Sequence, residues 1–317
     1  MRSTIFSCFL GLLARGALVA ALRPAGQDGV TPREPEEMDN PPEELLAIHR
    51  KLHDAGLASG QVRRDSGNGL PDLGDTVNTP INFEVYVHVV TGTQEGQDRA
   101  SDSIIQKQID VLNDAFQGNF TITRKGTDRT VNSVWAAGDD VKKMRDSLYK
   151  GDESTWNLYL LDVVKGRSGK AALGVSSSPI FAGRSSDSSL IDIDTLPGGS
   201  ESGYNLGKTA VHECGHWLGL VHTFLGGCDG FGDYVDDTPP EESASKSCNP
   251  RDSCPHKPGL DPINNYMNYS PDSCLTEFMP GQYIRARQLW AMFRAKDVPA
   301  PSASTTIQQT ATPSASI

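Results

Sequence analysis

The 317-residue chain is short of positive charge, with 29 Lys and Arg residues against 40 Asp and Glu residues and a formal net charge of -11. Binding to nucleic-acid phosphates needs a surplus of Lys and Arg, so this deficit argues against a nucleic-acid partner. Long apolar runs are also lacking, because the apolar stretch at residues 5–13 is too short and too broken to span a bilayer. We therefore predict a protein with no membrane-spanning segment, and we expect it to be a monomer.

Cysteine is scarce as well, and no two cysteines have the CxxC spacing of a four-thiolate structural zinc site. Of the six cysteines, Cys8 lies in the N-terminal apolar stretch and Cys214 in a histidine-rich motif. The other four gather in one short region and are Cys228, Cys248, Cys254 and Cys274. An even number of clustered cysteines in a secreted chain favours two disulfides. The sequence alone permits three pairings.

The two ends of the chain have the composition of processing segments. Residues 1–21 combine a basic residue, an apolar core and small residues up to Ala21, which predicts a signal peptide and hence secretion. Residues 22–79 are rich in Pro, Gly, Asp and Arg, include the dibasic pair Arg63-Arg64, and are interpreted as propeptide-like. Residues 298–317 are mostly Ser, Thr, Pro, Ala and Gln, which predicts a disordered tail. The folded domain is therefore expected at residues 80–297.

Within the folded domain, alternating apolar residues predict strands and helical spacing predicts helices. The expected strands are Ile81–Val90, Trp156–Val164, Val175–Ile180 and Ser189–Ile193. The expected helices are Ser103–Phe116, Tyr204–Leu218 and Pro280–Phe293, and a short amphipathic helix is expected upstream at Pro41–Ala55. This arrangement of strands and helices indicates an α+β fold.

The most informative motif combines three histidines and a glutamate. His212 and His216 are four residues apart, so on a helix they share one face and can bind one metal ion. Gly219 follows the last apolar helical residue and allows a sharp left-handed turn, which brings His222 back toward the same ion. Three imidazoles leave a fourth position for water, the arrangement of a catalytic zinc site. Glu213, next to the first ligand, can reach that water.

The remaining histidines lack this context. His49 and His53 are also four residues apart on an expected helix, but Arg50 stands where the glutamate would be and no third ligand follows. We interpret that pair as a solvated helix face. His88 lies within an expected strand and is predicted to be packed there, while nothing around His256 indicates a ligand. A bare HExxH arises by chance in many proteins, but the added glycine and third histidine make coincidence a poor explanation.

The metal motif predicts hydrolysis of peptide bonds in protein substrates. A zinc-activated water would attack the scissile carbonyl, with Glu213 as the general base that then protonates the leaving amine. Two alternatives are a catalytically silent zinc-binding recognition module and a zinc amidase for small molecules. The presence of Glu213 argues against the first, because a binding relic tolerates its loss. An exposed strand edge, which we expect at Gly174–Ile180, would favour extended peptides over small molecules.

Several strings around the metal motif carry a family resemblance. They are YNLGKTAVHECGHWLGLVHTF, GDYVDDTP, NYMNYSPDSC and FMPGQYIRAR. Together they resemble the pappalysin family of metzincin zinc endopeptidases, particularly its compact secreted members from microbes and fungi. The resemblance covers about Ile81 to Phe293. It implies a metzincin-like catalytic domain with a mixed twisted sheet, an active-site helix, a Met-turn and an irregular C-terminal part that is braced by disulfides.

The resemblance also implies roles for residues near the metal. Met267 would form the hydrophobic base under the zinc without binding it, and Tyr269 would donate a hydrogen bond to the tetrahedral intermediate. From the sequence alone, Met267 would be a core methionine and Tyr269 a half-buried loop residue. The resemblance further implies the disulfides Cys228–Cys254 and Cys248–Cys274.

A calcium site is implied in the acidic loop after the metal motif, with ligands from Asp233, Thr238 and nearby carbonyls. The alternative interpretation is a solvated acidic loop. The sequence departs from the family in one respect. Many secreted relatives carry a propeptide cysteine that can cap the zinc, whereas this chain has none between Cys8 and Cys214. If the protein is a zymogen, another group must cap the metal, and Asp65 is our hypothesis.

Two sequons for N-glycosylation begin at Asn119 and Asn268. The second falls within the expected Met-turn and should be buried. We therefore expect Asn119 to be the usable acceptor.

Overall fold

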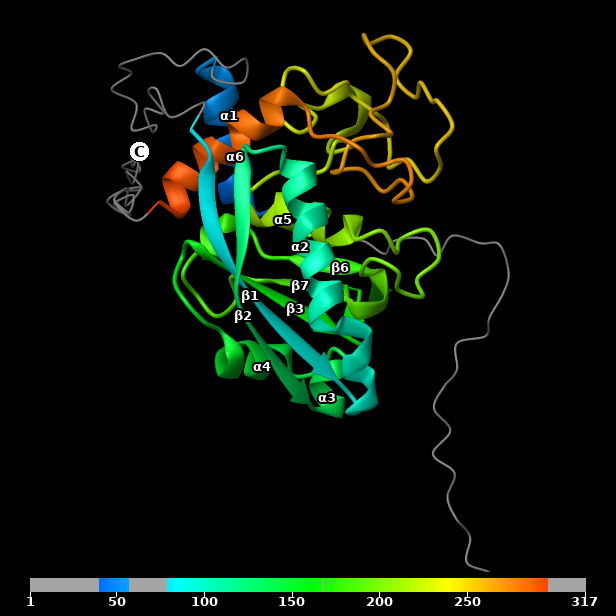
Figure 1. Cartoon of the computed structure of the whole chain (residues 1–317). Coiled ribbons are helices and arrows are strands. Elements are labelled where there is room, and N and C mark those ends of the chain that lie inside the picture. The colour runs from blue at the N-terminus through cyan, green and yellow to red at the C-terminus, as the bar shows by residue number, and fades with distance from the viewer. Residues whose placement is uncertain (1–39, 57–78, 167, 296–317) are drawn as a thin grey trace, which may run out of the picture. The chain divides into compact units, whose positions relative to one another are not determined.

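The computed structural model describes residues 40–56, 79–166 and 168–295 of the chain (Figure 1). The predicted signal peptide (1–21), the dibasic pair Arg63-Arg64, Asp65 and the predicted tail (298–317) lie outside these residues. None of the helices within the described ranges combines the length and the apolar character needed to cross a membrane.

A five-stranded mixed sheet organises the domain, with its strands in the order β2-β1-β3-β7-β6. The first four strands in this order are parallel, and β6 at the edge runs antiparallel to β7. The strands are β1 (Ile81–Thr91), β2 (Phe120–Val131), β3 (Thr155–Leu161), β6 (Gly174–Ser176) and β7 (Ser189–Asp192). A separate two-stranded pair consists of β4 (Val164–Lys165) and β5 (Ala171–Ala172).

Helices cover both faces of the sheet. The helices are α1 (Glu43–Asp54), α2 (Asp102–Phe116), α3 (Ser133–Ala136), α4 (Val141–Leu148), α5 (Lys208–Trp217) and α6 (Pro280–Phe293). Short 3-10 turns occur at η4 (Glu95–Ala100), η5 (Pro179–Phe181), η6 (Ile193–Thr195) and η7 (Gly227–Asp229). Helices α2 and α5 pack together over one face, and Met144 of α4 joins a separate cluster with Tyr159 and Leu161 of β3 on the other. The two clusters are distinct because successive strand residues point to opposite faces.

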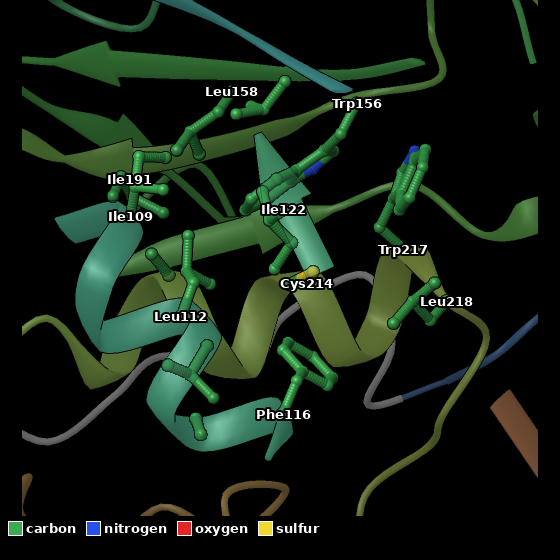
Figure 2. Close-up of a cluster of buried hydrophobic side chains, with 14 of the residues drawn as sticks. Ile109, Leu112, Phe116, Ile122, Trp156, Leu158, Ile191, Cys214, Trp217 and Leu218 are labelled. Carbon is green, nitrogen blue, oxygen red and sulfur yellow. The ribbon is translucent and has the colours of Figure 1, made fainter. Parts of the chain in front are cut away.

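The main core lies between the sheet and helices α2 and α5 (Figure 2). Trp156 and Leu158 of β3 meet Leu112 of α2 and Trp217 of α5, and all four side chains are almost completely buried. Burying side chains of this size stabilises the fold by roughly 1.5–3 kcal/mol each. The active-site helix is therefore fixed to the sheet by its apolar face.

The predicted α+β class and mixed sheet are confirmed, and the predicted final helix coincides with α6. Helix α5 begins at Lys208 and not at Tyr204, because Gly207 has a left-handed φ of 81°. Strand β2 was not predicted. Its buried alternation is confined to Phe120 and Ile122, and the rest of the strand is mostly polar and not buried.

The prediction of a solvated face at His49 is wrong. The His49 side chain is completely buried, between Leu45 and Leu52 on the inner face of α1, while His53 is half-buried. Both leucines belong to a buried cluster with Leu289 of α6. The apolar spacing on α1 thus reflects packing against the domain, and it carries His49 inward with the leucines.

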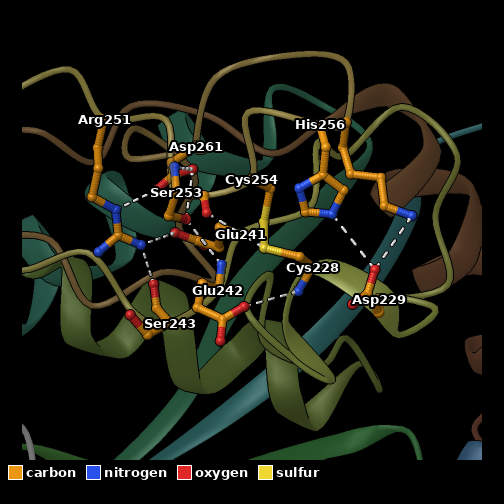
Figure 3. Close-up of a disulfide and its surroundings, with 11 residues drawn as sticks. Cys228, Asp229, Glu241, Glu242, Ser243, Arg251, Ser253, Cys254, His256 and Asp261 are labelled. Atoms are coloured by element: carbon orange, nitrogen blue, oxygen red, sulfur yellow. Dashed lines mark hydrogen bonds and ion pairs between the residues drawn. A yellow bond between two sulfur atoms is a disulfide. The ribbon is translucent and has the colours of Figure 1, made fainter.

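The C-terminal part is irregular, as the resemblance implies. From Leu218 to Met279 the chain forms one short 3-10 turn and an isolated bridge. Two disulfides brace it, Cys228–Cys254 and Cys248–Cys274, with Cα separations of 5.5 and 5.4 Å. These are the two pairings that the resemblance implies. Figure 3 shows the first of them beside Arg251, whose guanidinium contacts Glu241 and Asp261.

Candidate metal centre

Three histidine side chains converge at the end of α5. The Nε2 atom of His216 lies 3.0 Å from those of His212 and His222, and the latter two are 3.2 Å apart. All three side chains are fully buried. Nitrogen ligands at zinc lie about 2.0–2.1 Å from the ion, which sets tetrahedral ligands about 3.3 Å apart. The triad therefore has the spacing to hold one zinc ion.

The hydrogen bonds of the first two rings fix their tautomers. His212 donates from Nδ1 to the Tyr266 carbonyl at 2.6 Å, and His216 donates from Nδ1 to the Leu220 carbonyl at 2.8 Å. Because a carbonyl oxygen can only accept, each Nδ1 carries the proton and each Nε2 presents a lone pair. Backbone carbonyls that orient ligand imidazoles in this way are typical of protein zinc sites. The donor set fits the metal that the motif predicts.

Backbone geometry explains how residues so close in sequence reach one point. Helix α5 ends at Trp217, and Gly219 follows with φ 97°. A side chain at Gly219 would also collide with Leu289, since its Cβ would lie 2.4 Å from Leu289 Cδ1. Only glycine combines this conformation with this close approach. The turn then returns the chain to place His222 beside the first two ligands.

Glu213 follows His212 on α5 and is fully buried. Strand β6 lies directly against its carboxylate: a Cβ on Gly174 would come within 2.3 Å of Glu213 Oε1. A Cβ at position 174 would therefore displace the Glu213 side chain, although the φ of Gly174 is not left-handed. The predicted strand edge is therefore present as β6 and lies beside the glutamate. It is shorter than expected, because residues 179–181 form a 3-10 turn.

The predicted Met-turn lies under the active-site helix. Met267 is fully buried, and a Cβ on Gly215 would lie 2.5 Å from its sulfur. Tyr269 is 6% exposed, with its ring centre 4.9 Å from that of His222 and 5.7 Å from that of His212. Phe224 was not singled out in the sequence. Its ring stacks on His222 at 4.7 Å and meets Tyr269 edge-on at 5.0 Å.

A buried carboxylate, Glu241, links Thr223, the residue after the third histidine, to the Met-turn and was also missed. Its Oε1 accepts from the Thr223 hydroxyl at 2.6 Å and from the Asn268 amide at 2.8 Å. Its Oε2 accepts from Arg251 at 3.2 Å. Burial raises the pKa of this carboxyl, and the Thr223 and Asn268 hydrogen bonds oppose the increase. No local motif marks Glu241, since its partners are distant in sequence.

The predicted calcium ligands lie near one another. Asp233 is buried, and it accepts from the Val235 backbone at 3.1 Å and from the Gln282 amide at 3.0 Å. Burial raises the pKa of Asp233 to about 7, with the Thr238 hydroxyl among the groups that oppose the increase. A carboxylate held away from water in this way gains from a neighbouring cation. The interpretation as a solvated acidic loop does not fit Asp233, although Asp236 is exposed.

The remaining predictions concern two histidines outside the triad and the two sequon asparagines. His88 is buried on β1, as expected, and lies 2.9 Å from an Asp128 oxygen. His256 is exposed and pairs with Asp229. Asn268 is fully buried, as expected for that sequon, and Asn119 is half-buried in the turn between α2 and β2.

Known proteins resemble this chain over most of its length. Residues 198–291 match the peptidase family M43, described as pregnancy-associated plasma protein-A. The chain is 48% identical over 221 residues to an extracellular metalloprotease of Pyricularia oryzae, a match covering 68% of this chain and 77% of that protein. It is 41% identical over 293 residues to an extracellular metalloprotease of Verticillium alfalfae, covering 90% of this chain and 100% of that protein.

Among solved structures, the fold resembles that of Tannerella forsythia mature mirolysin in complex with a cleaved peptide. The TM-score is 0.55 and the sequence identity 26%, over 67% of this chain and 92% of that chain. The family match, the named relatives and the shared fold all indicate a metallopeptidase, and the geometry of the histidine triad agrees with that assignment. The chain therefore belongs to the pappalysin family of metzincin peptidases, peptidase family M43, and is a metalloendopeptidase.

Proposed function

We propose that the protein is a secreted zinc endopeptidase that hydrolyses peptide bonds in protein substrates. His212, His216 and His222 would hold one zinc ion, and Glu213 would act as the general base. The observation that carries the proposal is the convergence of three Nε2 atoms within 3.0–3.2 Å, at the end of the helix that also carries the buried Glu213. Secretion is supported by relatives that are named extracellular metalloproteases.

Each residue of the site would have a separate task. Bound zinc would supply a Lewis acid that lowers the pKa of a water and polarises the scissile carbonyl. Glu213 would take the proton from the attacking water and deliver it to the leaving amine. Tyr269, beside two of the ligands, would donate its hydroxyl proton in a hydrogen bond to the oxyanion of the tetrahedral intermediate. Met267 would support the ligands from below through apolar contact.

The position of β6 favours polypeptide substrates. β6 is the end strand of the sheet and lies against Glu213, so an extended chain could add to this edge through backbone hydrogen bonds. The likeness to mirolysin, whose structure contains a cleaved peptide, supports the same substrate class. Neither observation favours a small-molecule amidase. The buried Glu213 in turn argues against a silent zinc-binding module.

We also propose a calcium ion at Asp233 and Thr238. The buried Asp233 carboxyl, whose pKa is raised to about 7, is the supporting observation. Carboxylate, hydroxyl and carbonyl oxygens are the ligands that calcium prefers. A calcium ion there would stabilise the ionised carboxyl and the loop that carries it.

Replacement of Glu213 by Gln tests the catalytic proposal, because glutamine keeps the size of the side chain and removes the base. We expect Glu213→Gln to bind one zinc per chain and to lose kcat by on the order of 10²–10⁴-fold on a peptide substrate. Glu242→Ala, at an exposed glutamate near the Cys228–Cys254 disulfide, serves as the control. His222→Ala should lose the zinc, as measured by atomic absorption. A Glu213→Gln variant with full activity would defeat the proposal.

A further inference from the structure

Helix α1, upstream of the first strand, packs against the turn that follows the active-site helix. Leu45 and Leu52 of α1 are completely buried in a cluster with Val221 and Leu289. Val221 directly precedes the third histidine ligand. The spacing of Leu45, His49 and Leu52 places all three on one face of α1. His49 therefore points at the turn between His216 and His222.

Both ring nitrogens of His49 have fixed partners. The Arg285 guanidinium lies 2.6 Å from Nδ1, and the Gly219 carbonyl lies 2.9 Å from Nε2. A guanidinium can only donate, so Nδ1 is the acceptor, and Nε2 carries the proton that it donates to Gly219. The buried Arg285 is itself held by the Tyr234 carbonyl at 2.9 Å. Burial and Arg285 lower the pKa of His49 well below its ordinary value, which agrees with a neutral ring.

The Gly219 carbonyl is at the centre of the turn, three residues from each flanking ligand. Its neighbour, the Leu220 carbonyl, accepts from Nδ1 of the ligand His216 at 2.8 Å. Two successive carbonyls of the turn are thus held by two different imidazoles, one from the metal site and one from α1. Because Gly219 has left-handed backbone geometry and no side chain, the hydrogen bond from His49 is an external restraint on its orientation.

We propose that His49 is a positioning residue for the metal centre and that α1 is therefore needed for full zinc affinity and full activity. The inference rests on the proposed zinc peptidase function. Without the donor at Nε2, the turn would lose the restraint that sets the direction of His222. We therefore expect weaker zinc binding and a lower kcat, with KM little changed, because neither hydrogen-bonding partner of His49 belongs to β6, the edge where substrate would bind.

Two conservative substitutions separate the two hydrogen bonds. Glutamine at position 49 can place its amide nitrogen near the former Nε2 and keep the donor to Gly219. Asparagine can place its oxygen near the former Nδ1 and keep the acceptor for Arg285, but it cannot reach Gly219. We expect His49→Asn to weaken zinc binding and lower kcat by about tenfold each, as for other outer partners of metal ligands. His49→Gln should stay within about threefold of the parent.

The measurements are made on the full chain. Zinc affinity is obtained by competition with a chromophoric chelator, kcat and KM from a quenched peptide substrate, and stability from thermal unfolding of the metal-free protein. Lys51→Ala, exposed on the same helix, is the neutral control. Leu52→Ala loosens α1 without touching either hydrogen bond, so it calibrates how much zinc affinity falls when packing alone is lost.

Several outcomes would overturn the inference. One is equal zinc affinity in His49→Asn and His49→Gln. Another is a loss of zinc affinity in His49→Asn that is no larger than the loss in Leu52→Ala when the two variants lose the same amount of stability. Recovery of fully active enzyme that lacks residues 43–54, shown by mass spectrometry, would also overturn it. If the parent itself binds no zinc or the Glu213→Gln variant stays active, the proposed function fails instead, so the two failures are distinguishable.

Discussion

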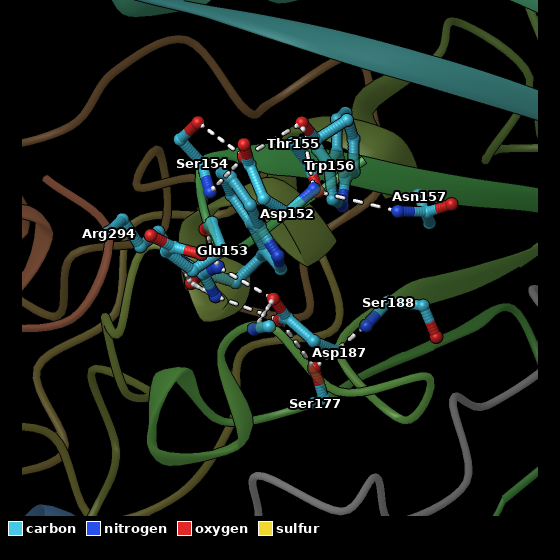
Figure 4. Close-up of polar contacts among 12 residues, drawn as sticks. Asp152, Glu153, Ser154, Thr155, Trp156, Asn157, Ser177, Asp187, Ser188 and Arg294 are labelled. Atoms are coloured by element: carbon cyan, nitrogen blue, oxygen red, sulfur yellow. Dashed lines mark hydrogen bonds and ion pairs between the residues drawn. The ribbon is translucent and has the colours of Figure 1, made fainter. Parts of the chain in front are cut away.

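The guanidinium of Arg294 lies over the indole ring of Trp217, with Cζ 3.6 Å from the ring centre. Arg294 also donates to the Trp217 carbonyl from Nε and from Nη2, at 3.1 and 2.8 Å. Trp217 is the last residue of α5, where helical carbonyls lack partners within the helix. Asp187 completes the arrangement by accepting two hydrogen bonds from the guanidinium, at 2.9 and 3.0 Å (Figure 4). The residue after α6 thus supports the end of the active-site helix.

Replacement of Arg294 by Ala should destabilise the protein strongly. Both Arg294 and Asp187 are completely buried, and removal of the cation leaves a buried carboxylate without its charge partner. The expected loss is about 3–5 kcal/mol in the free energy of unfolding, measured by urea denaturation of the zinc-free protein. Arg184→Ala, at an exposed arginine, should change it by less than about 0.5 kcal/mol. A loss below about 1 kcal/mol for Arg294→Ala would contradict this account.

Gly174→Ala should impair catalysis while the metal stays bound. The new methyl group would lie 2.3 Å from Glu213 Oε1, so the carboxylate must move, and the three atoms nearest to the methyl group all belong to Glu213. Displacement of a catalytic group by about 1 Å can cost on the order of 10²-fold in rate. We expect such a fall in kcat with unchanged zinc content. Val175→Ala, on the opposite face of β6, provides the matched control; a Gly174→Ala enzyme with parental kcat would rule out the predicted contact.

Glu241→Ala should lower the affinity for zinc, although Glu241 is not itself one of the three ligands. The substitution removes the acceptor of Thr223, next to the ligand His222, and of Asn268, which separates Met267 from Tyr269. Hydrogen bonds to charged groups contribute about 1.5–3 kcal/mol each, so we expect a stability loss of that order and zinc affinity lower by about tenfold. Glu241→Gln keeps an oxygen for both donors and should lose less affinity.

Glu242→Ala, at the exposed adjacent position, controls for loss of negative charge. The prediction is tested by chelator competition and urea denaturation on the same preparations. Equal zinc affinity in the Glu241→Ala variant and the parent would show that the network does not reach the ligands.

Features set by neighbours in sequence could be predicted, and features set by distant contacts could not. The histidine triad depends on one helical turn and one glycine turn, so the spacing of His212, His216 and His222 was sufficient. Strand β2 was missed because a strand at the edge of a sheet needs little apolar surface. It is held by backbone pairing with β1 along its whole length.

The same distinction applies around the site. Glu241 and Gly174 act on residues far along the chain, and nothing in their local sequence marks those contacts. His49 shows how a correct local pattern can be misread. The apolar spacing on α1 predicted its helix, but Leu45 and Leu52 could not reveal that Val221 and Leu289 would cover that face. The histidine between the two leucines is buried with them.

Docking of α1 should weaken in acid. The folded-state pKa of His49 is lowered below its ordinary 6.5, by burial first and by the Arg285 charge second, so the unfolded chain binds the proton more readily. The stabilisation from neutral His49 is present above pH 6.5 and is lost as pH falls toward the folded-state pKa. The charged and titratable groups that face the His49 ring are Arg285 of α6 and Tyr234, which lies in the irregular segment between α5 and α6.

Thermal unfolding of the zinc-free parent between pH 7.5 and 5 should therefore show a decline that His49→Gln reduces, because glutamine does not titrate. Lys51→Ala should keep the full decline. A His49→Gln profile with the parental slope would assign the acid sensitivity to other groups.

Calcium should stabilise the protein more at high pH than at low pH. The Asp233 carboxyl has a pKa raised by burial from 3.8 to about 7, so in the cation-free protein the folded state holds its proton more tightly than the unfolded state. The stability that comes from this proton is fully present below pH 3.8 and is lost as pH rises through 7. A calcium ion beside the ionised carboxylate would offset that loss.

The expected result is a calcium-induced increase in the melting temperature that is clear at pH 8 and small at pH 5.5. In Asp233→Asn, both the pH-dependent loss and most of the calcium effect should disappear, since the amide neither titrates nor carries charge. Asp236→Asn, at an exposed aspartate of the same loop, tests whether loop charge alone is enough. If calcium raises the melting temperature of Asp233→Asn as much as that of the parent, the ion binds elsewhere. A buried carboxylate that binds calcium cannot be replaced by a neutral side chain without loss of calcium affinity.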